Sequence, residues 1–333
     1  MRFVIFGAGA IGGVVGAKLR QSGFDVALIA RGAHYEAIRD HGLTLEWPGG
    51  SVVLEVPVAD SPGALEWGGH EVVLLATKSQ DTATALETMR GAAPASTPVV
   101  CLQNGVENER VALRLFANVY GAVVMSPTAH LEPGIVQAYG TRGTGVIDVG
   151  RYPSGLDALC EEVADALGAS DFSSVARPDI MRFKYAKLLN NVGNAVDAIC
   201  EPGPDADELY KLAREEGRDV LRAAGIEFVA EDVNDVEARW ARLDLKPIAG
   251  RERAGSSTRQ SIARGTPTVE TDYLNGEIAL LGRLHRVATP VNDALCELSA
   301  RHVRERRPPR TVPAGEVLAL ARSAEYADGS VPR

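Results

Sequence analysis

A lysine and two asparagines stand at helical spacing near the middle of the chain. Lys187, Asn191 and Asn194 occupy positions i, i+4 and i+7, so a continuous helix would carry them on one face. A face buried in a core would have apolar residues at these positions. An ammonium can donate a proton and amides can orient a carboxylate or a hydroxyl, so the pattern favours a polar cleft. The alternative is a solvent-exposed polar stripe, in which more Glu and Arg would be expected.

The N-terminal residues predict a phosphate-binding turn. The motif G-x-G-x-x-G is formed by Gly7, Ala8, Gly9, Ala10, Ile11 and Gly12. It follows an apolar run, Arg2–Phe6, and opens an amphipathic stretch, Ile11–Gln21. In such a motif the first glycine permits the turn, the second admits a pyrophosphate, and the third lets the helix approach the strand. An ordinary glycine-rich turn is the alternative, which the order strand, turn, helix, strand disfavours.

The end of the second expected strand, Asp25–Ala30, indicates which dinucleotide is bound. An NAD site usually has Asp or Glu there to bind the ribose 2′-hydroxyl, whereas this chain has Arg31. A guanidinium pairs with a 2′-phosphate that a carboxylate would repel. The sequence therefore favours NADPH, with a solvated arginine at the strand end as the alternative.

Two further expected strands end in polar residues. Lys78 follows the apolar run Val72–Ala76, and Asn104 follows Val99–Leu102. Open α/β sheets bind ligands at the carboxyl ends of their strands, so both side chains are candidates for a site. Ordinary turn chemistry is the alternative, because Asn-Gly, here Asn104 with Gly105, is a common turn pair.

The candidate residues at the ends of the expected strands require a sheet to position them. Lys187, Asn191 and Asn194 require a helix. Before residue 175, further strand-like runs occur at 52–58, 122–125, 135–139 and 145–149, with helical patterns at 34–41, 82–89 and 156–167. After Pro178 helical patterns dominate, at 178–199, 205–224, 231–242, 257–264, 268–286, 290–306 and 314–326. We expect an α/β doubly wound domain at 1–175 and an all-helical domain at 176–333.

Composition limits the partners. The chain has 333 residues and a formal net charge of −9, which argues against nucleic acid and against an anionic membrane surface. Its four cysteines form no C-x-x-C pair, and the scattered His and Cys residues offer no metal ligand set. No apolar run approaches membrane-spanning length, and the chain enters its first strand without a signal core. We expect a cytoplasmic protein without a metal.

Taken together, these pieces resemble one enzyme family over essentially the whole chain. The matching residues are the glycine motif, Arg31, Lys78, Gln103-Asn104-Gly105, Lys187-Leu188-Leu189 with Asn191, Ser256-Ser257, Gln260 and Glu270-Thr271-Asp272-Tyr273-Leu274-Asn275-Gly276. The family is that of the ketopantoate reductases (2-dehydropantoate 2-reductases), which belong with the 6-phosphogluconate-dehydrogenase-like enzymes.

The resemblance implies an assignment of roles. The N-terminal Rossmann-like half would hold NADPH, and the helical half would form the substrate wall. Lys187 would be the general acid in the reduction of 2-dehydropantoate to pantoate for pantothenate biosynthesis, because an ammonium stabilises the developing alkoxide and then donates a proton. Asn104 would lie beside the nicotinamide and the substrate, and Glu270 near the cofactor.

The remaining polar residues would bind the small-molecule 2-oxo acid. Asn191, Asn194 and Ser257, together with Asn104, are hydrogen-bonding side chains suited to a hydroxyl, a carbonyl and a carboxylate. Two of the assigned residues have structural alternatives, because Glu270 could be a first-turn acid of a helix and Ser257 a helix N-cap.

Departures from the family pattern leave the substrate open. Asn194 follows Asn191 by three residues where the family usually has four, and Ala254 stands where a substrate-contacting asparagine is expected. A related NADPH-dependent reductase of another 2-oxo acid, or an opine-type dehydrogenase, is therefore the alternative. A non-catalytic NADPH-binding sensor would need neither Lys187 nor Glu270. The helical half could also expose an apolar face for a homodimer.

Overall fold

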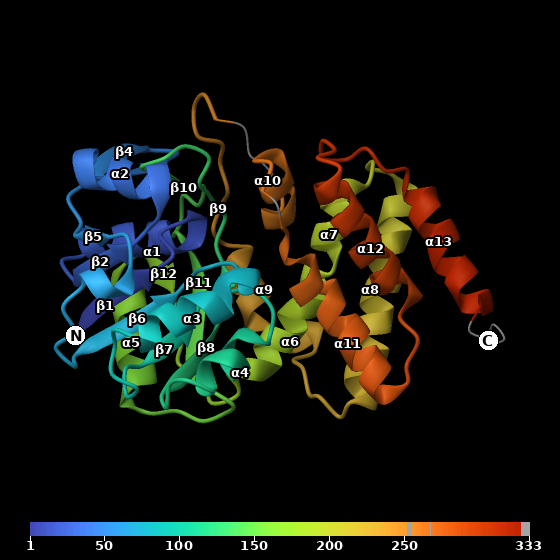
Figure 1. Ribbon diagram of the computed structural model, residues 1–333, viewed down its shortest axis with the longest axis horizontal. Coiled ribbons are helices and arrows are strands. Elements are labelled where there is room, and N and C mark those ends of the chain that lie inside the picture. Colours follow the sequence, from blue (N-terminus) through green and yellow to red (C-terminus); the bar gives the residue numbers. More distant parts are fainter. Residues whose placement is uncertain (252–254, 267, 328–333) are drawn as a thin grey trace. The chain divides into compact units, whose positions relative to one another are not determined.

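The computed structural model describes residues 1–251, 255–266 and 268–327 (Figure 1). By internal contacts the chain divides into two compact units, and each has its own secondary structure. The first unit comprises Met1–Lys184 and Ala230–Arg253, and the second comprises Tyr185–Val229 and Ala254–Arg333.

An eight-stranded sheet organises the first unit. Its strands are β1 (Arg2–Phe6), β2 (Asp25–Ile29), β5 (Val58–Ala59), β6 (Glu71–Leu75), β7 (Val99–Cys101), β8 (Val119–Met125), β11 (Gly145–Arg151) and β12 (Phe172–Ser173). Their order is β12-β11-β8-β7-β6-β1-β2-β5. Neighbours from β8 to β5 pair in parallel, whereas β11 runs antiparallel to β8. Strongly β-forming, apolar sequences such as Val72–Leu75 explain why these segments become buried central strands.

Helices cover both faces of this sheet because its side chains alternate. Phe3 and Ile5 of β1 join a core with α1 (Ala10–Gln21) and α5 (Ala158–Ala169). Val4 and Phe6 point the other way and join a core with α3 (Thr82–Arg90) and α4 (Asn108–Leu113). The arrangement is Rossmann-like and doubly wound, as the sequence predicted (Figure 1).

A second, four-stranded sheet was only partly foreseen. Its strands are β4 (Gly50–Leu54), β3 (Leu43–Trp47), β10 (Ile135–Ala138) and β9 (Thr128–Ala129), in that order. The short elements α2 (Gly32–His41), η1 (Pro62–Ala64) and η2 (Ser79–Asp81) complete this part of the chain.

The single strand predicted at 52–58 was wrong. It divides into β4 and β5, which belong to different sheets and are separated by a segment containing Pro57, whose carbonyl accepts from the Leu28 N–H at 2.8 Å.

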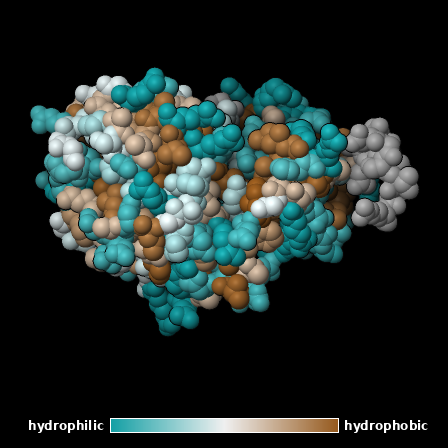
Figure 2. All heavy atoms as spheres, turned by 90° about the horizontal axis from the view of Figure 1, so that it is seen from below, coloured by the Kyte–Doolittle hydropathy of each residue, from teal (hydrophilic) through white to brown (hydrophobic). Residues whose placement is uncertain are grey.

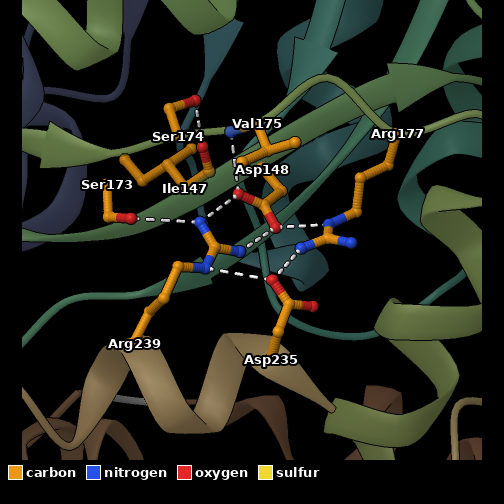
Figure 3. A network of polar contacts seen from close by, with 8 residues as sticks. All are labelled: Ile147, Asp148, Ser173, Ser174, Val175, Arg177, Asp235 and Arg239. Carbon is orange, nitrogen blue, oxygen red and sulfur yellow. Dashed lines mark hydrogen bonds and ion pairs between the residues drawn. The ribbon is translucent and has the colours of Figure 1, made fainter. Parts of the chain in front are cut away.

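The segment 230–253 groups with the first unit, so the structure does not follow a single division at residue 175. Its elements are η3 (Glu231–Val233) and α9 (Asp235–Trp240), both within the helix expected at 231–242. Figure 3 shows Arg239 of α9 and Arg177 converging on the buried carboxylate of Asp148 in β11. Arg239 Nη1 donates to Asp148 Oδ1 at 2.9 Å and Arg177 Nε donates to Asp148 Oδ2 at 2.5 Å. A buried carboxylate needs such partners, and one of them comes from this segment.

Helices build the second unit. They are the part of α6 (Ile180–Asn191) from Tyr185 onward, α7 (Gly193–Ile199), α8 (Pro204–Ala223), α10 (Ser257–Ala263), η4 (Glu270–Tyr273), α11 (Asn275–His285), α12 (Pro290–Arg304) and α13 (Ala314–Ala327). The helix expected at 268–286 is thus η4 followed by α11.

The single helix expected at 178–199 was also wrong, because α6 and α7 meet at Val192. The Val192 carbonyl accepts a hydrogen bond at 3.0 Å from the buried side chain of Asn275. Gly193 lies against the ring of Tyr210, where a Cβ atom would come within 2.6 Å of the ring. A tertiary hydrogen bond and a close backbone contact therefore accompany the interruption, and both involve residues distant in sequence.

The surface is mostly hydrophilic on the face that Figure 2 shows, with apolar residues in small groups among polar ones. Within the described helices, none combines the length and the apolar character that a membrane crossing requires.

Candidate functional site

Four neighbouring parallel strands bring predicted site residues to one edge of the large sheet. Phe6 at the end of β1 pairs with Ile29 of β2 and Leu75 of β6, and Leu75 pairs with Cys101 of β7. The carboxyl ends of these strands therefore lie side by side, and each continues into a predicted residue. In strand order these are Asn104 after β7, Lys78 after β6, Gly7 after β1 and Arg31 after β2. This edge is where open α/β sheets bind ligands.

The glycine motif has the backbone geometry that a dinucleotide phosphate requires. Gly7 has φ +103°, and a Cβ atom there would lie 2.8 Å from the Thr77 backbone nitrogen. A Cβ at Gly12 would lie 2.2 Å from the Gly7 carbonyl oxygen, so these two glycines are required by the fold itself. At Gly9 a Cβ would meet nothing within 4 Å. The fold leaves space beside Gly9, which fits the approach of a pyrophosphate.

The N-terminus of α1, the helix that follows the motif, is suited to bind an anion. The first turn of α1 contains no acidic residue, and its N-cap residue, Gly9, forms no side-chain cap. Backbone N–H groups at a helix N-terminus and the helix dipole both favour an anion. The residues present therefore fit a dinucleotide.

Arg31 occupies the N-cap position of α2 and is exposed. Among the side chains that the structure describes (residues 1–251, 255–266 and 268–323), no carboxylate forms an ion pair with its guanidinium, and the first turn of α2 contains no acidic residue. The side chain is thus a cation at the strand end, where NAD sites usually carry a carboxylate.

A buried polar network fixes the turn that carries Asn104. The side-chain amide of Asn108 donates to the Asn104 carbonyl at 3.0 Å and to the Ser79 hydroxyl at 3.3 Å. Thr82 donates to the Asn108 side-chain oxygen at 2.7 Å and accepts from Gln103 at 3.2 Å. The turn after β7 and the residues next to Lys78 after β6 are therefore held together, since buried polar groups are stable only when hydrogen-bonded.

A buried ion pair lies beneath the same turn. Lys184 Nζ donates to the Gln103 carbonyl at 3.1 Å and forms an ion pair with Glu109 Oε1. Burial raises the pKa of the Glu109 carboxyl, and the Lys184 ammonium opposes this rise. Neither residue was predicted from the sequence. Lys184 stands three residues before Lys187 on α6, but nothing in its spacing indicated a buried partner in another element.

The structure divides the three residues of the predicted helix face. Lys187 and Asn191 lie one turn apart on α6, whereas Asn194 lies on α7 beyond the interruption at Val192. The expected single face of one helix is therefore wrong for Asn194. The Asn191 side-chain oxygen is buried and accepts no hydrogen bond from any described residue, which leaves an acceptor for a ligand.

Ser257 is the first residue of α10, and the N-cap is Ser256, whose hydroxyl accepts from the Arg259 N–H at 3.3 Å. The Ser256 hydroxyl also donates to the Asn194 carbonyl at 3.4 Å, so Asn194 and Ser257 come close within the second unit. The Ser256 N–H donates to Asp197 of α7 at 2.9 Å. Burial would raise the pKa of Asp197, but this hydrogen bond and Arg310 outweigh it and lower the pKa.

Two predicted positions remain, Glu270 and Ala254, and the structure describes only the first. Glu270 begins η4 and is 6% exposed, and it belongs to the second unit. Ala254 lies outside the described residues. Among the residues that the structure describes, no group of three His, Cys, Asp or Glu side chains could hold a metal ion.

Two residues at the sheet edge were not predicted. The hydroxyl of Thr77, next to Lys78, is buried and has no hydrogen-bond partner among the described residues. His34 of α2 contacts the glycine motif, with its Nε2 atom 2.7 Å from the Ala8 carbonyl oxygen. Thr77 could have been found as the residue between a strand end and Lys78. His34 carried no signal, because it stands 26 residues from Ala8.

Comparison with known proteins agrees with this geometry. The family model described as "Ketopantoate reductase PanE/ApbA" matches residues 3–154, and "Ketopantoate reductase PanE/ApbA C terminal" matches residues 179–302. The 2-dehydropantoate 2-reductase of Pyrococcus horikoshii is 32% identical over 306 residues, which cover 90% of this chain and 96% of that protein.

Solved structures are similar over the same length. A PanE/ApbA family ketopantoate reductase from Ralstonia eutropha JMP134 has a TM-score of 0.78 and 29% identity, covering 92% of this chain and 100% of that chain. D-mandelate dehydrogenase, solved with NADH and anilino(oxo)acetate, has a TM-score of 0.77 and 25% identity, covering 92% and 99%. The chain therefore belongs to the ketopantoate reductase (PanE/ApbA) family of oxidoreductases.

Proposed function

We propose that the protein reduces 2-dehydropantoate (ketopantoate) to pantoate with NADPH, a step of pantothenate biosynthesis. The observation that carries the proposal is the row formed by Asn104, Lys78, Gly7 and Arg31 on consecutive parallel strands. The name of the Pyrococcus horikoshii relative, 2-dehydropantoate 2-reductase, supports the same substrate.

A nicotinamide dinucleotide suits the glycine motif, and Arg31 favours NADPH over NADH. The guanidinium can pair with a 2′-phosphate through two charge-assisted hydrogen bonds. The motif residues Gly7, Ala8, Gly9, Ala10, Ile11 and Gly12 would hold the pyrophosphate. Lys78 would add a second positive charge at the same edge, and Glu270 would lie near the cofactor.

The chemistry assigns one task to each polar side chain. When bound, the cofactor supplies the hydride that reduces the C2 carbonyl of the 2-oxo acid. Lys187 stabilises the negative charge on the carbonyl oxygen and donates the proton that completes the hydroxyl group. Asn191 offers its unpartnered buried oxygen to a substrate hydroxyl. Asn104 orients the substrate against the nicotinamide.

Asn194 and Ser257 would complete the substrate contacts. The contact between the Ser256 hydroxyl and the Asn194 carbonyl keeps the start of α10 beside α7. The neutral side chains of Asn194 and Ser257 can form hydrogen bonds with the substrate carboxylate without removing its charge.

Reduction of another 2-oxo acid is a second candidate. D-mandelate dehydrogenase is as similar in fold as the ketopantoate reductase from Ralstonia eutropha JMP134, with TM-scores of 0.77 and 0.78. Asn194 follows Asn191 by three residues where four are expected, and Ala254 replaces an expected asparagine, so hydrogen bonds to the substrate would differ from the family pattern. Such differences change substrate preference.

The test is oxidation of NADPH by the purified protein, followed by absorbance. Ketopantoate, the 2-oxo acid corresponding to mandelate, and other branched 2-oxo acids are compared at equal concentrations, each with NADPH and with NADH. We expect the highest kcat/KM for ketopantoate with NADPH. A higher kcat/KM for an aromatic 2-oxo acid would favour the second candidate, and no oxidation with any of them would contradict both.

A cytoplasmic location and a homodimer stay predictions. Leu280 and Leu284 stand one turn apart on α11 and are 47% and 66% exposed, so they are residues that a dimer contact would cover. Sedimentation of the purified protein measures its oligomeric state.

A further inference from the structure

His34 joins the glycine motif to a distant loop through both nitrogens of its ring. Its Nε2 atom lies 2.7 Å from the Ala8 carbonyl oxygen, and the Gly134 N–H donates to its Nδ1 atom at 2.9 Å. A carbonyl oxygen can only accept, and a backbone N–H can only donate. The ring is therefore neutral, with its proton on Nε2.

The bond to Ala8 fixes the orientation of one peptide group. In a planar trans peptide the carbonyl and the following N–H point in opposite directions, so the Ala8 carbonyl sets the direction of the Gly9 N–H. The Ala8 oxygen also lies close to α1, where a Cβ atom at Gly13 would come within 2.7 Å of it. With the carbonyl held by His34 and directed toward α1, the Gly9 N–H is directed away from both. Gly9 is also the motif glycine beside which the fold leaves open space.

The surroundings of His34 keep its ring neutral and in place. The ring of His130 lies 4.1 Å away between centroids, and His130 Nδ1 is 3.0 Å from the Ile135 carbonyl oxygen. Burial, and then the charge of His130, lower the pKa of His34 to about 4. The loop between β9 and β10 therefore supports the ring, and through it the glycine motif.

We propose that His34 is a positioning residue of the dinucleotide site, because its neutral ring holds the Ala8–Gly9 peptide with the Gly9 N–H available to the pyrophosphate. The inference rests on the proposed function, since it concerns how the same site binds its cofactor. His34 itself does not touch the reacting atoms, and it acts through the backbone of the motif.

Two substitutions separate the two hydrogen bonds of the ring. The side-chain amide of Gln can reach the position of Nε2 and donate to Ala8, whereas Asn can supply an acceptor near the position of Nδ1 for Gly134 but cannot reach Ala8. The dissociation constant of NADPH is measured by fluorescence titration for the wild type, His34→Gln and His34→Asn. Exposed His41 on the same helix provides the matched control His41→Asn.

We expect His34→Gln and His41→Asn to bind NADPH within about twofold of the wild type, and His34→Asn to bind about tenfold more weakly, the scale of one lost hydrogen bond. Thermal unfolding of each variant shows whether it is folded. Equal affinity of His34→Asn and the wild type would overturn the inference, as would equal losses in the Gln and Asn variants. Failure of the wild type to bind either NADPH or NADH would instead overturn the proposed function.

A spectroscopic measurement tests the same inference without a variant. The ¹⁵N shifts of the His34 ring in the protein without ligand report which nitrogen carries the proton. We expect a protonated Nε2 and an unprotonated Nδ1 near neutral pH. A proton on Nδ1 would overturn the inference even if His34→Asn did not fold, because that neutral tautomer has no hydrogen on Nε2 to donate to the Ala8 carbonyl.

Discussion

The ammonium of Lys184 and the carboxylate of Glu109 form an ion pair whose side chains are 2% and 0% exposed. Lys184 also donates at 3.1 Å to the carbonyl of Gln103, the residue immediately before Asn104. Because Lys184 precedes Lys187 by three residues on α6, one helix carries both the lysine of this pair and the proposed proton donor. The ion pair thus joins the first turns of this helix to α4, and the hydrogen bond from Lys184 joins them to the turn that carries Asn104.

Removing one partner of this pair should destabilise the protein strongly. Glu109→Gln leaves the Lys184 ammonium buried without a countercharge, which costs about 3–5 kcal/mol of unfolding free energy. Urea denaturation measures the loss. The matched control is Asp219→Asn, which breaks an exposed pair with Arg222 whose side chains are both 66% exposed, and it should cost less than about 0.5 kcal/mol. Similar effects of the two substitutions would contradict the importance of the buried pair.

Arg31→Asp should weaken binding of NADPH much more than binding of NADH. The substitution replaces the proposed partner of the 2′-phosphate with a repelling carboxylate, so we expect a loss of about 10- to 100-fold in NADPH affinity and little change for NADH. Fluorescence titration with each cofactor measures both constants. Arg39→Asp makes the same charge change further along α2 and should affect the two cofactors equally. Equal losses for both cofactors in Arg31→Asp would show that Arg31 does not bind the 2′-phosphate.

Lys187→Ala should abolish most turnover while leaving NADPH affinity nearly unchanged. A positioned general acid contributes about 10²- to 10⁴-fold, so kcat should fall on that scale. The proposed cofactor-binding residues, the glycine motif and Arg31, lie on other elements. Exposed Lys211 of α8 provides the control Lys211→Ala, for which kcat should not change. Near-wild-type turnover in folded Lys187→Ala would rule out the proposed proton donor.

The neutral ring of His34 should make stability depend on pH in the acid range. Burial, followed by His130, lowers the pKa of His34 from 6.5 to about 4 in the folded protein. Between these pH values the unfolded chain binds a proton that the folded chain does not, so this ring makes stability fall as pH falls. His34→Gln removes that titration. The wild type's stability relative to His34→Gln should therefore be constant above pH 6.5 and decrease toward pH 4.

Urea denaturation of both proteins at about pH 7.5 and about pH 5 measures this difference. His41→Gln, which removes an exposed ring on the same helix, is the control. A difference between wild type and His34→Gln that stays constant across this range would show that the folded and unfolded states bind the His34 proton equally.

Much of the first unit could be predicted because its signals are local. The run Arg2–Phe6, the glycine motif and the helix after it carry their strand, turn and helix preferences within about 20 residues. Arg31 could be placed at a strand end for the same reason. Parallel strands align their carboxyl ends, so the sheet edge that gathers Lys78 and Asn104 followed from the strand assignments alone.

Other features depended on contacts between residues far apart in sequence. Arg239 reaches Asp148 across 91 residues, which explains why the segment 230–253 groups with the sheet although its local pattern is helical. The Asn275 side chain donates to the Val192 carbonyl, 83 residues away, where α6 ends, and Asn194 lies on the helix beyond this interruption.

The sequence by itself determined the strand–glycine–helix unit, the cation at the end of β2 and the family to which the chain belongs. Only the tertiary structure decided that His34 holds the Ala8 carbonyl and that Lys184 pairs with Glu109, across 26 and 75 residues. The physical reason is that helix and strand preferences act between near neighbours in the chain. A buried polar group, in contrast, is satisfied by whichever partner the folded chain brings to it, and local spacing does not identify that partner.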